Sequence, residues 1–370
     1  MNGAALERIG EIVRKELRQI FRDPRMRAVI FVAPLIQLVV FGYAVSTDVR
    51  NTPMLVVDHD RTAASRSLVE AMTSSGWFRL AGRSHDERDM VSGLDHGEVV
   101  VGLVIPAGLA RELERGTASV QVIFDGTNSN VATVARGYAE RILIEWGLRH
   151  AGTPRPPAIE LRERAWFNPA LDSRSYNVPG VAGLIIFLIC LLLTSLAIVR
   201  EREVGTLEQL MVSPIRPWEL IAGKCIPFAA IGLFDLALVT AVAMAWFDVP
   251  FRGSASLLLL ASALYIVSGL GIGLFISTIS STQQEAFMAT FLVFLPAILL
   301  AGFMFPVRSM PELFQAITIV NPVRHYLEIV RSIFLKGAGF AALWQHFVAL
   351  LLIGGSILAV AAARFEKRIG

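Results

Sequence analysis

The stretch that decides the fold is Glu201–Lys224, EREVGTLEQLMVSPIRPWELIAGK, a charged segment between two long apolar runs. Gly180–Val199 precedes it and Ile226–Phe247 follows it. As a helix, each run can cross the ~30 Å hydrocarbon core of a bilayer. The charges of the segment cannot lie in lipid without a large free-energy cost. We therefore expect residues 200–220 to form a short polar helical element at a membrane face, with a proline turn at Pro214 and Pro217.

The composition is typical of an integral membrane protein. Of 370 residues, 54% are hydrophobic and 18% are charged, and the mean hydropathy is +0.57. The two cysteines, Cys190 and Cys225, lie within or beside apolar runs, so we expect neither a disulfide nor a thiolate metal site. The net charge of +3 is too small to indicate nucleic acid as a partner.

Six apolar runs have the length of transmembrane helices: Ala28–Val45, Gly180–Val199, Ile226–Phe247, Leu257–Ile279, Ala286–Phe305 and Leu343–Ala363. The sequence therefore predicts an α-helical polytopic membrane protein with six transmembrane helices, of which helices 2–6 lie in residues 180–370. Lys and Arg concentrate in residues 1–27, in residues 200–224 and after Ala363, and such segments stay in the cytoplasm. Both termini are thus predicted to be cytoplasmic.

An amphipathic helix is predicted over residues 1–27, ahead of the first span at residues 28–45. Apolar residues recur at helical spacing from Leu6 to Ile20. The basic residues on its other faces are Arg14, Lys15, Arg18 and Arg22. Such a helix can lie along the inner headgroup layer as an interface helix or dock a partner protein, and the two roles are compatible.

Residues 46–179 separate the first two spans and are predicted to form an extracytoplasmic α/β domain. Strand-like apolar runs occur there at Pro53–Val57, Val99–Ile105 and Ser119–Phe124, and they alternate with stretches of helical periodicity. His59 and Asp125 follow strand-like runs and are the best candidates for catalysis, yet no catalytic or metal-binding motif accompanies them. We therefore expect neither a catalytic nor a metal site.

The run Asn321–Gly337, NPVRHYLEIVRSIFLKG, combines an apolar helical face with charged residues that are spaced to share a face and pair. It indicates a re-entrant or interfacial segment at the outer leaflet, within residues 306–342. The polar residues and the proline singled out in it are Asn321, Pro322, Arg324, Glu328 and Arg331. For any single residue of this run, packing in an ordinary interfacial helix is an equally good interpretation.

Asp235 is a lone carboxyl group in the apolar run Ile226–Phe247. In a membrane span it must face a polar cavity, form a pair or be protonated. Because no second carboxyl group occurs at a matching depth, a structural hydrogen bond is favoured over a role as a proton relay.

Three segments in this order resemble the permease of a type-2 ABC transporter: KELRQIFRDPR at residues 15–25, the connector Glu201–Lys224, and Asn321–Gly337. The resemblance covers nearly the whole chain, and the large domain after the first span is similar to that of bacterial multidrug-type exporters. It implies that the connector forms a coupling helix seated on a separate ATPase subunit. By similarity the coupling residues are Glu201, Glu203, Gly205, Thr206, Glu208 and Leu210, with Pro214 at the end of the helix.

The resemblance implies a permease subunit in a bacterial cytoplasmic (inner) membrane that moves an amphiphilic small molecule or lipid outward. The expected partners are an ABC ATPase subunit, a second permease copy or a sibling permease, membrane lipid and a periplasmic adaptor protein. ATP and Mg²⁺ would bind to the ATPase, because Gly223–Cys225 lacks the upstream glycine and the hydroxyl of a phosphate-binding loop. No cofactor is expected on this chain.

Two other classes of function remain open from the sequence. A membrane-anchored receptor or assembly factor would also carry an external α/β domain, but would rarely need six spans with glycine-rich packing. A membrane enzyme would need paired catalytic groups at one depth, and the sequence shows none.

Overall fold

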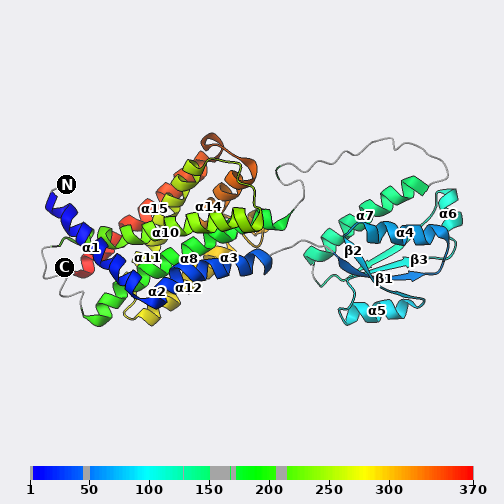
Figure 1. Ribbon diagram of the computed structural model, residues 1–370, viewed down its shortest axis with the longest axis horizontal. Coiled ribbons are helices and arrows are strands. Elements are labelled where there is room, and N and C mark those ends of the chain that lie inside the picture. The colour runs from blue at the N-terminus through cyan, green and yellow to red at the C-terminus, as the bar shows by residue number, and fades with distance from the viewer. Residues whose placement is uncertain are drawn as a thin grey trace. The chain divides into compact units, whose positions relative to one another are not determined.

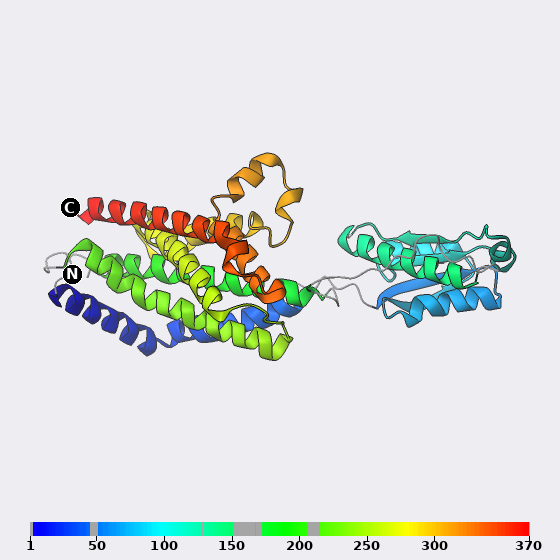
Figure 2. The same ribbon diagram turned by 90° about the horizontal axis from the view of Figure 1, so that it is seen from above.

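The computed structural model describes residues 3–44, 51–127, 129–150, 167, 172–205 and 215–369. The chain forms two compact units, one of residues 1–46 with 165–370 and one of residues 47–164. Figures 1 and 2 show the first unit as a helical bundle and the second as a sheet with helices packed on it.

Four helices of the first unit are long and apolar enough to cross a membrane: α8 (Ser173–Val204), α10 (Pro217–Phe247), α11 (Ala255–Ile279) and α15 (Phe340–Ile369). Two shorter apolar segments accompany them, η1 with α3 (Ala28–Val32 and Ala33–Ala44) and α12 (Gln283–Leu299). Four of the six predicted spans therefore coincide with helices of spanning length. A total of six crossings stays a prediction, because the first and fifth spans are short.

Helix α8 is the centre of the bundle and contacts α3, α10, α11, α12 and α14. Its side chains from Val178 to Val199 are almost all buried, as expected for a helix that is apolar on every face. Helix α11 approaches it closely at Gly273, where an added Cβ would lie 2.8 Å from Thr194 Cβ and 2.9 Å from the Leu191 carbonyl oxygen. The glycines of α11 thus serve packing within the chain.

The remaining elements of the first unit are short or lie at its ends: α1 (Gly3–Arg22), α2 (Pro24–Arg27), η2 (Val307–Ser309), α13 (Glu312–Thr318), α14 (Pro322–Arg331) and η3 (Ser332–Lys336). Helix α14 begins at the side chain of Asn321, which accepts a hydrogen bond from the Val323 amide at 3.1 Å. Tyr326 of α14 stacks on Tyr265 of α11 with ring centroids 4.0 Å apart. The predicted outer segment is therefore packed into the bundle.

The second unit contains a four-stranded sheet of order β2-β1-β3-β4. Its strands are β1 (Thr52–Asp58), β2 (Phe78–Ser84), β3 (Val101–Ile105) and β4 (Gln121–Phe124), parallel except for β4. Helices α4 (Ala63–Ser74), α6 (Leu109–Arg115) and α7 (Ser129–His150) share one apolar core with the sheet, and α5 (Glu87–Asp95) covers the other face. The sequence missed β2 and α5. Edge strand β2 contains two arginines and buries only Phe78 fully, so it lacks the apolar run of a buried strand.

We predict that Gly273→Ala lowers the free energy of unfolding by roughly 1–3 kcal/mol, since the new methyl group would collide with α8. The matched control is Gly355→Ala in α15, where nothing lies within 4 Å of an added Cβ. Thermal unfolding of the two variants in detergent measures the difference. Equal unfolding midpoints would contradict the close packing of α11 on α8.

Candidate functional site

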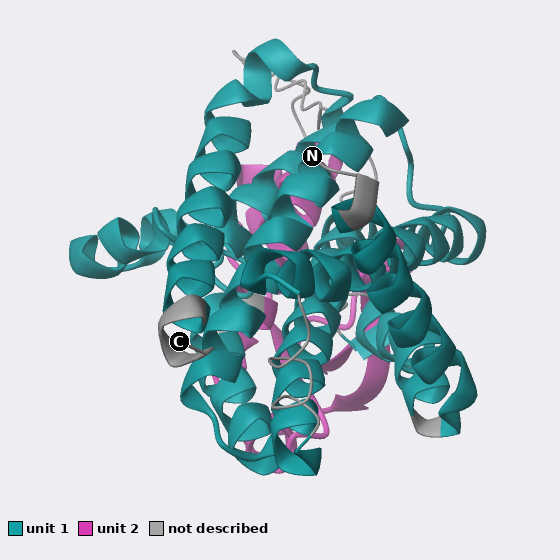
Figure 3. Ribbon diagram, turned by 90° about the vertical axis from the view of Figure 1, so that its left-hand side faces the viewer, with its two compact units in different colours: residues 1–46, 165–370 teal, residues 47–164 magenta. Residues whose placement is uncertain are grey.

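The candidate site lies at the end of the bundle that α1 crosses, which is the end where both chain termini are marked (Figure 3). The apolar face of α1, with Ile9, Ile12 and Ile20, is buried. Gly223 of α10 admits Ile12 of α1 so closely that an added Cβ would lie 2.7 Å from Ile12 Cγ2. The amphipathic helix therefore packs on the protein itself and presents its basic face outward.

A cluster of four charged side chains, of which all but Lys15 are buried, joins α1 to α8 and α10, and we call it the interlock. It consists of Lys15 and Glu16 of α1, Glu201 of α8 and Lys224 of α10. Lys224 is 2% exposed; its Nζ donates to Glu16 Oε1 at 2.9 Å and lies 3.1 Å from Glu201 Oε1. Lys15 Nζ donates to the same Glu201 oxygen at 2.9 Å. Because buried charges are stable only when paired, the cluster fixes the position of α1.

Further polar contacts tie the neighbouring helix ends together. Arg8 of α1 donates two hydrogen bonds to Glu219 at the start of α10, at 2.9 and 2.6 Å. Glu219 also accepts a hydrogen bond from the backbone amide of Arg216 at 3.1 Å, and this bond caps the start of α10. At the end of α8, Glu203 accepts a hydrogen bond from the Gln283 amide of α12 at 2.8 Å. The ends of α1, α8, α10 and α12 are thus joined by ion pairs and hydrogen bonds.

The prediction of a separate polar helix beginning at residue 200 is wrong for the described residues. Helix α8 continues without a break to Val204 and ends at Gly205, whose φ of 76° is the left-handed conformation that favours glycine. Glu201 is 7% exposed, because Lys224 and Lys15 hold it inside the protein. The other predicted coupling residues, Thr206, Glu208, Leu210 and Pro214, lie outside the described residues.

Comparison with known proteins identifies the family. Residues 24–363 match the family described as "ABC-2 family transporter protein". The chain belongs to the ABC-2 transporter family. It is 34% identical to the Escherichia coli (strain K12) "Probable multidrug ABC transporter permease YbhR", over 98% of this chain and 99% of that protein.

Two further E. coli (strain K12) relatives are similar to this ABC-2 protein over most of their length. "Probable multidrug ABC transporter permease YbhS" is 35% identical over 89% of each chain, and "Inner membrane transport permease YhhJ" is 31% identical over 96% of each. Together with the apolar helices, these relationships establish the chain as a multi-pass membrane protein and the permease subunit of an ABC transporter.

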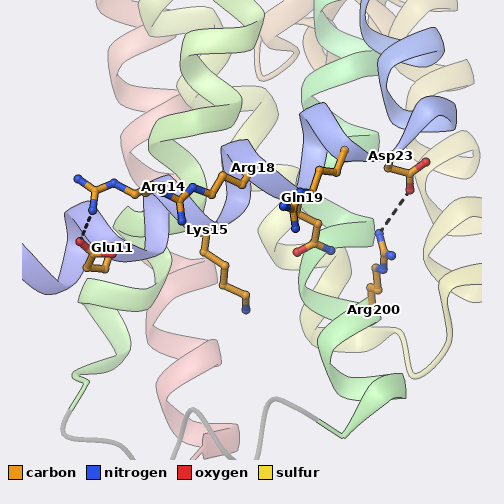
Figure 4. Close-up of a pocket in the computed structure, with 8 residues that line it drawn as sticks. Glu11, Arg14, Lys15, Arg18, Gln19, Asp23 and Arg200 are labelled. Carbon is orange, nitrogen blue, oxygen red and sulfur yellow. Dashed lines mark hydrogen bonds and ion pairs between the residues drawn. The ribbon is translucent and has the colours of Figure 1, made fainter.

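The exposed face of α1 in this permease is basic. Arg14 is paired with Glu11 at 2.6 Å, whereas Arg18 and Arg22 are exposed and make no hydrogen bond or ion pair among the described residues. Arg200 of α8 approaches Asp23 at 3.9 Å. Figure 4 shows these side chains around an open pocket of ≈ 560 Å³.

In the outer segment, the predicted pairing of Arg324, Glu328 and Arg331 is wrong, since no ion pair joins the three in the described chain. Arg324 donates to the Thr318 hydroxyl of α13, and Glu328 is exposed. Arg331 is buried instead against α8, with its guanidinium 3.9 Å from the centre of the Tyr176 ring and Nη1 donating to the Gly302 carbonyl at 3.3 Å. Tertiary contacts therefore override the helical spacing. Asn321 caps α14, and Pro322 occupies its first turn.

Asp235 is fully buried in α10, and neither of its carboxyl oxygens has a hydrogen-bond partner among the described residues. Within the part of the chain that the structure describes, the expected structural hydrogen bond is therefore not formed, and a buried carboxyl group without a partner is uncommon.

Of the two candidate catalytic groups of the second unit, His59 is exposed. The other candidate, Asp125, and the carboxylates on either side of His59 serve turns and helix caps. Asp58 accepts hydrogen bonds from the amides of Asp60 and Arg61 at 3.0 and 2.9 Å. Asp60 accepts one from the Gly108 amide at 2.8 Å; burial favours its neutral form, but this bond and that from Thr62 outweigh burial and lower its pKa. Asp125 accepts hydrogen bonds from Thr127. Among the described residues, no three metal-ligating side chains come together.

We predict that Lys224→Met releases α1, since it leaves Glu16 and Glu201 without their buried cation. Breaking a buried ion pair in this way costs roughly 3–5 kcal/mol. Hydrogen–deuterium exchange of residues 3–22 should then accelerate strongly.

The matched control is Lys336→Met, at an exposed lysine after α14. It should leave the exchange of α1 unchanged. Unchanged exchange of α1 in Lys224→Met would show that the interlock does not hold the helix.

Proposed function

We propose that this permease is the membrane half of an ATP-driven exporter in a bacterial cytoplasmic membrane. The chain would cross the bilayer six times, with both termini and the interlock on the cytoplasmic side and the unit of residues 47–164 outside. The concentration of Lys and Arg in residues 1–27 and 200–224 supports this orientation. The names of the relatives support a multidrug-type substrate. We infer that this substrate is an amphiphilic small molecule or lipid and that it is moved outward.

The observation that carries the proposal is the interlock. It joins α1, α8 and α10 at one end of the bundle, so that a force applied there moves three helices together. A separate ATPase subunit that closes on ATP and Mg²⁺ would press on the connector between α8 and α10, and the helices would pass the motion on as a rigid body. In this proposal the chain itself binds no nucleotide and no other cofactor.

The working unit would contain two permease subunits and two ATPase subunits. The second permease is another copy of this chain or a sibling chain, and a periplasmic adaptor protein would extend the path outward. The connector would face the ATPase with its coupling residues Thr206, Glu208 and Leu210. Glu201 would not contact the ATPase but would hold α1 and α10 in place through the interlock.

We predict that Glu208→Lys reduces the affinity for the ATPase about tenfold or more, because a reversed charge in an interface costs over 1.4 kcal/mol. The permease and its ATPase would be co-expressed, purified through a tag on the permease, and assayed for substrate efflux from proteoliposomes. The control is Glu312→Lys, at an exposed carboxylate of α13.

Recovery of an ATPase and ATP-dependent efflux with the wild type, and the loss of both with Glu208→Lys alone, would support the proposal. Equal recovery with both variants would contradict docking through the connector. A wild-type chain that brings down no ATPase and drives no efflux would instead indicate a membrane-anchored receptor or assembly factor.

A further inference from the structure

Two adjacent cavities lie between α1 and α8, and both are lined by Gln19 and Arg200. The first is the open pocket of ≈ 560 Å³ along the basic face of α1. The second is a narrow crevice of ≈ 80 Å³ between α1, α8 and α10. A charged cavity therefore borders a mostly apolar one.

The open pocket carries an excess of positive charge. Its two carboxylates, Glu11 and Asp23, each face an arginine already, at 2.6 Å and 3.9 Å. This leaves Arg18 and Arg22, both exposed and without a hydrogen bond or ion pair among the residues that the structure describes. Free guanidinium groups bind phosphate and carboxylate oxygens in a bidentate manner. The pocket is therefore suited to an anion.

The crevice has the opposite chemistry over most of its surface. Its apolar walls are formed by Ile20, Met26, Leu193, Leu196, Ala197 and Phe228. Its small volume admits only a few methylene groups of one unbranched chain. Glu16 and Glu201 of the interlock also line it, and the lysines of the interlock are already paired with them, so this side offers an anion no free lysine. An anionic group would therefore stay in the open pocket while an apolar chain enters the crevice.

We propose that the two cavities form one binding site for an anionic phospholipid of the leaflet that faces α1. The phosphate lies between Arg18 and Arg22, and an acyl chain enters the crevice beside Phe228. Since the crevice lies against the interlock, the bound lipid stabilises the docked position of α1. The location of the lipid rests on the membrane placement proposed above.

The test uses the full chain alone, in nanodiscs of phosphatidylcholine. The probes are photo-activatable phosphatidylglycerol and photo-activatable phosphatidylcholine with identical acyl chains, and the labelled peptides are identified by mass spectrometry. We expect phosphatidylglycerol to label residues 14–22 and 193–200 at least fivefold more than phosphatidylcholine, which corresponds to about 1 kcal/mol. Equal labelling by the two lipids would overturn the proposal.

Variants separate the two parts of the site. Arg18→Gln with Arg22→Gln should reduce labelling by phosphatidylglycerol about tenfold, whereas Arg18→Lys with Arg22→Lys should retain most of it. The control is Arg364→Gln, the same change at an exposed arginine in the last turns of α15. An equal loss in Arg364→Gln would show a general charge effect and overturn the site.

Leu196→Trp fills the crevice and should reduce labelling by phosphatidylglycerol. With the wild-type chain, inorganic phosphate added at millimolar concentration should compete only weakly with that labelling. Full competition by inorganic phosphate, with labelling unaffected by Leu196→Trp, would show a site for free anions and overturn the proposal. No ATPase is present in this experiment, so its failure leaves the exporter proposal standing. Conversely, loss of ATPase docking in Glu208→Lys leaves lipid labelling unchanged.

Discussion

The position of α1 against α8 and α10 depends on one buried cation. Lys224 of α10 is enclosed by Glu16 of α1 and Glu201 of α8, residues that lie far apart in the sequence. A buried ion pair adds little stability compared with apolar packing, but the loss of one member is costly. The interlock therefore specifies one position of α1 more than it strengthens the bundle. Every other feature of the site, from the Arg8–Glu219 pair to the basic pocket, requires α1 in that position.

Packing within the bundle turns this local connection into a larger rigid body. Helix α8 is buried along most of its length, and α11 approaches it through Gly273 without intervening side chains. The C-terminal end of α8 is held by the interlock, and its first half packs against α14. A displacement of α1 would thus reach the outer segment through a single continuous helix.

The sequence predicted the features that depend on local pattern. Buried strands β1 and β3 appear as apolar runs, four spans of full length appear as long apolar segments, and the amphipathic α1 shows its periodicity. Edge strand β2 was missed because it has only one buried face. Pairings across the chain could not be predicted: Glu201 looked like an exposed charge because Lys224 and Lys15 become its partners only after folding. The same holds for Arg331, which packs against Tyr176 of α8.

The central claim is that α1 and α10 move together because of the interlock. Nitroxide labels at the exposed positions Glu7 of α1 and Ile226 of α10 report this directly, in a chain whose two cysteines have been replaced. Electron–electron distance measurements would be made in nanodiscs with the ATPase, with and without ATP. The account predicts one narrow distance distribution that ATP leaves unchanged. A broad distribution, or one that shifts when ATP binds, would contradict it.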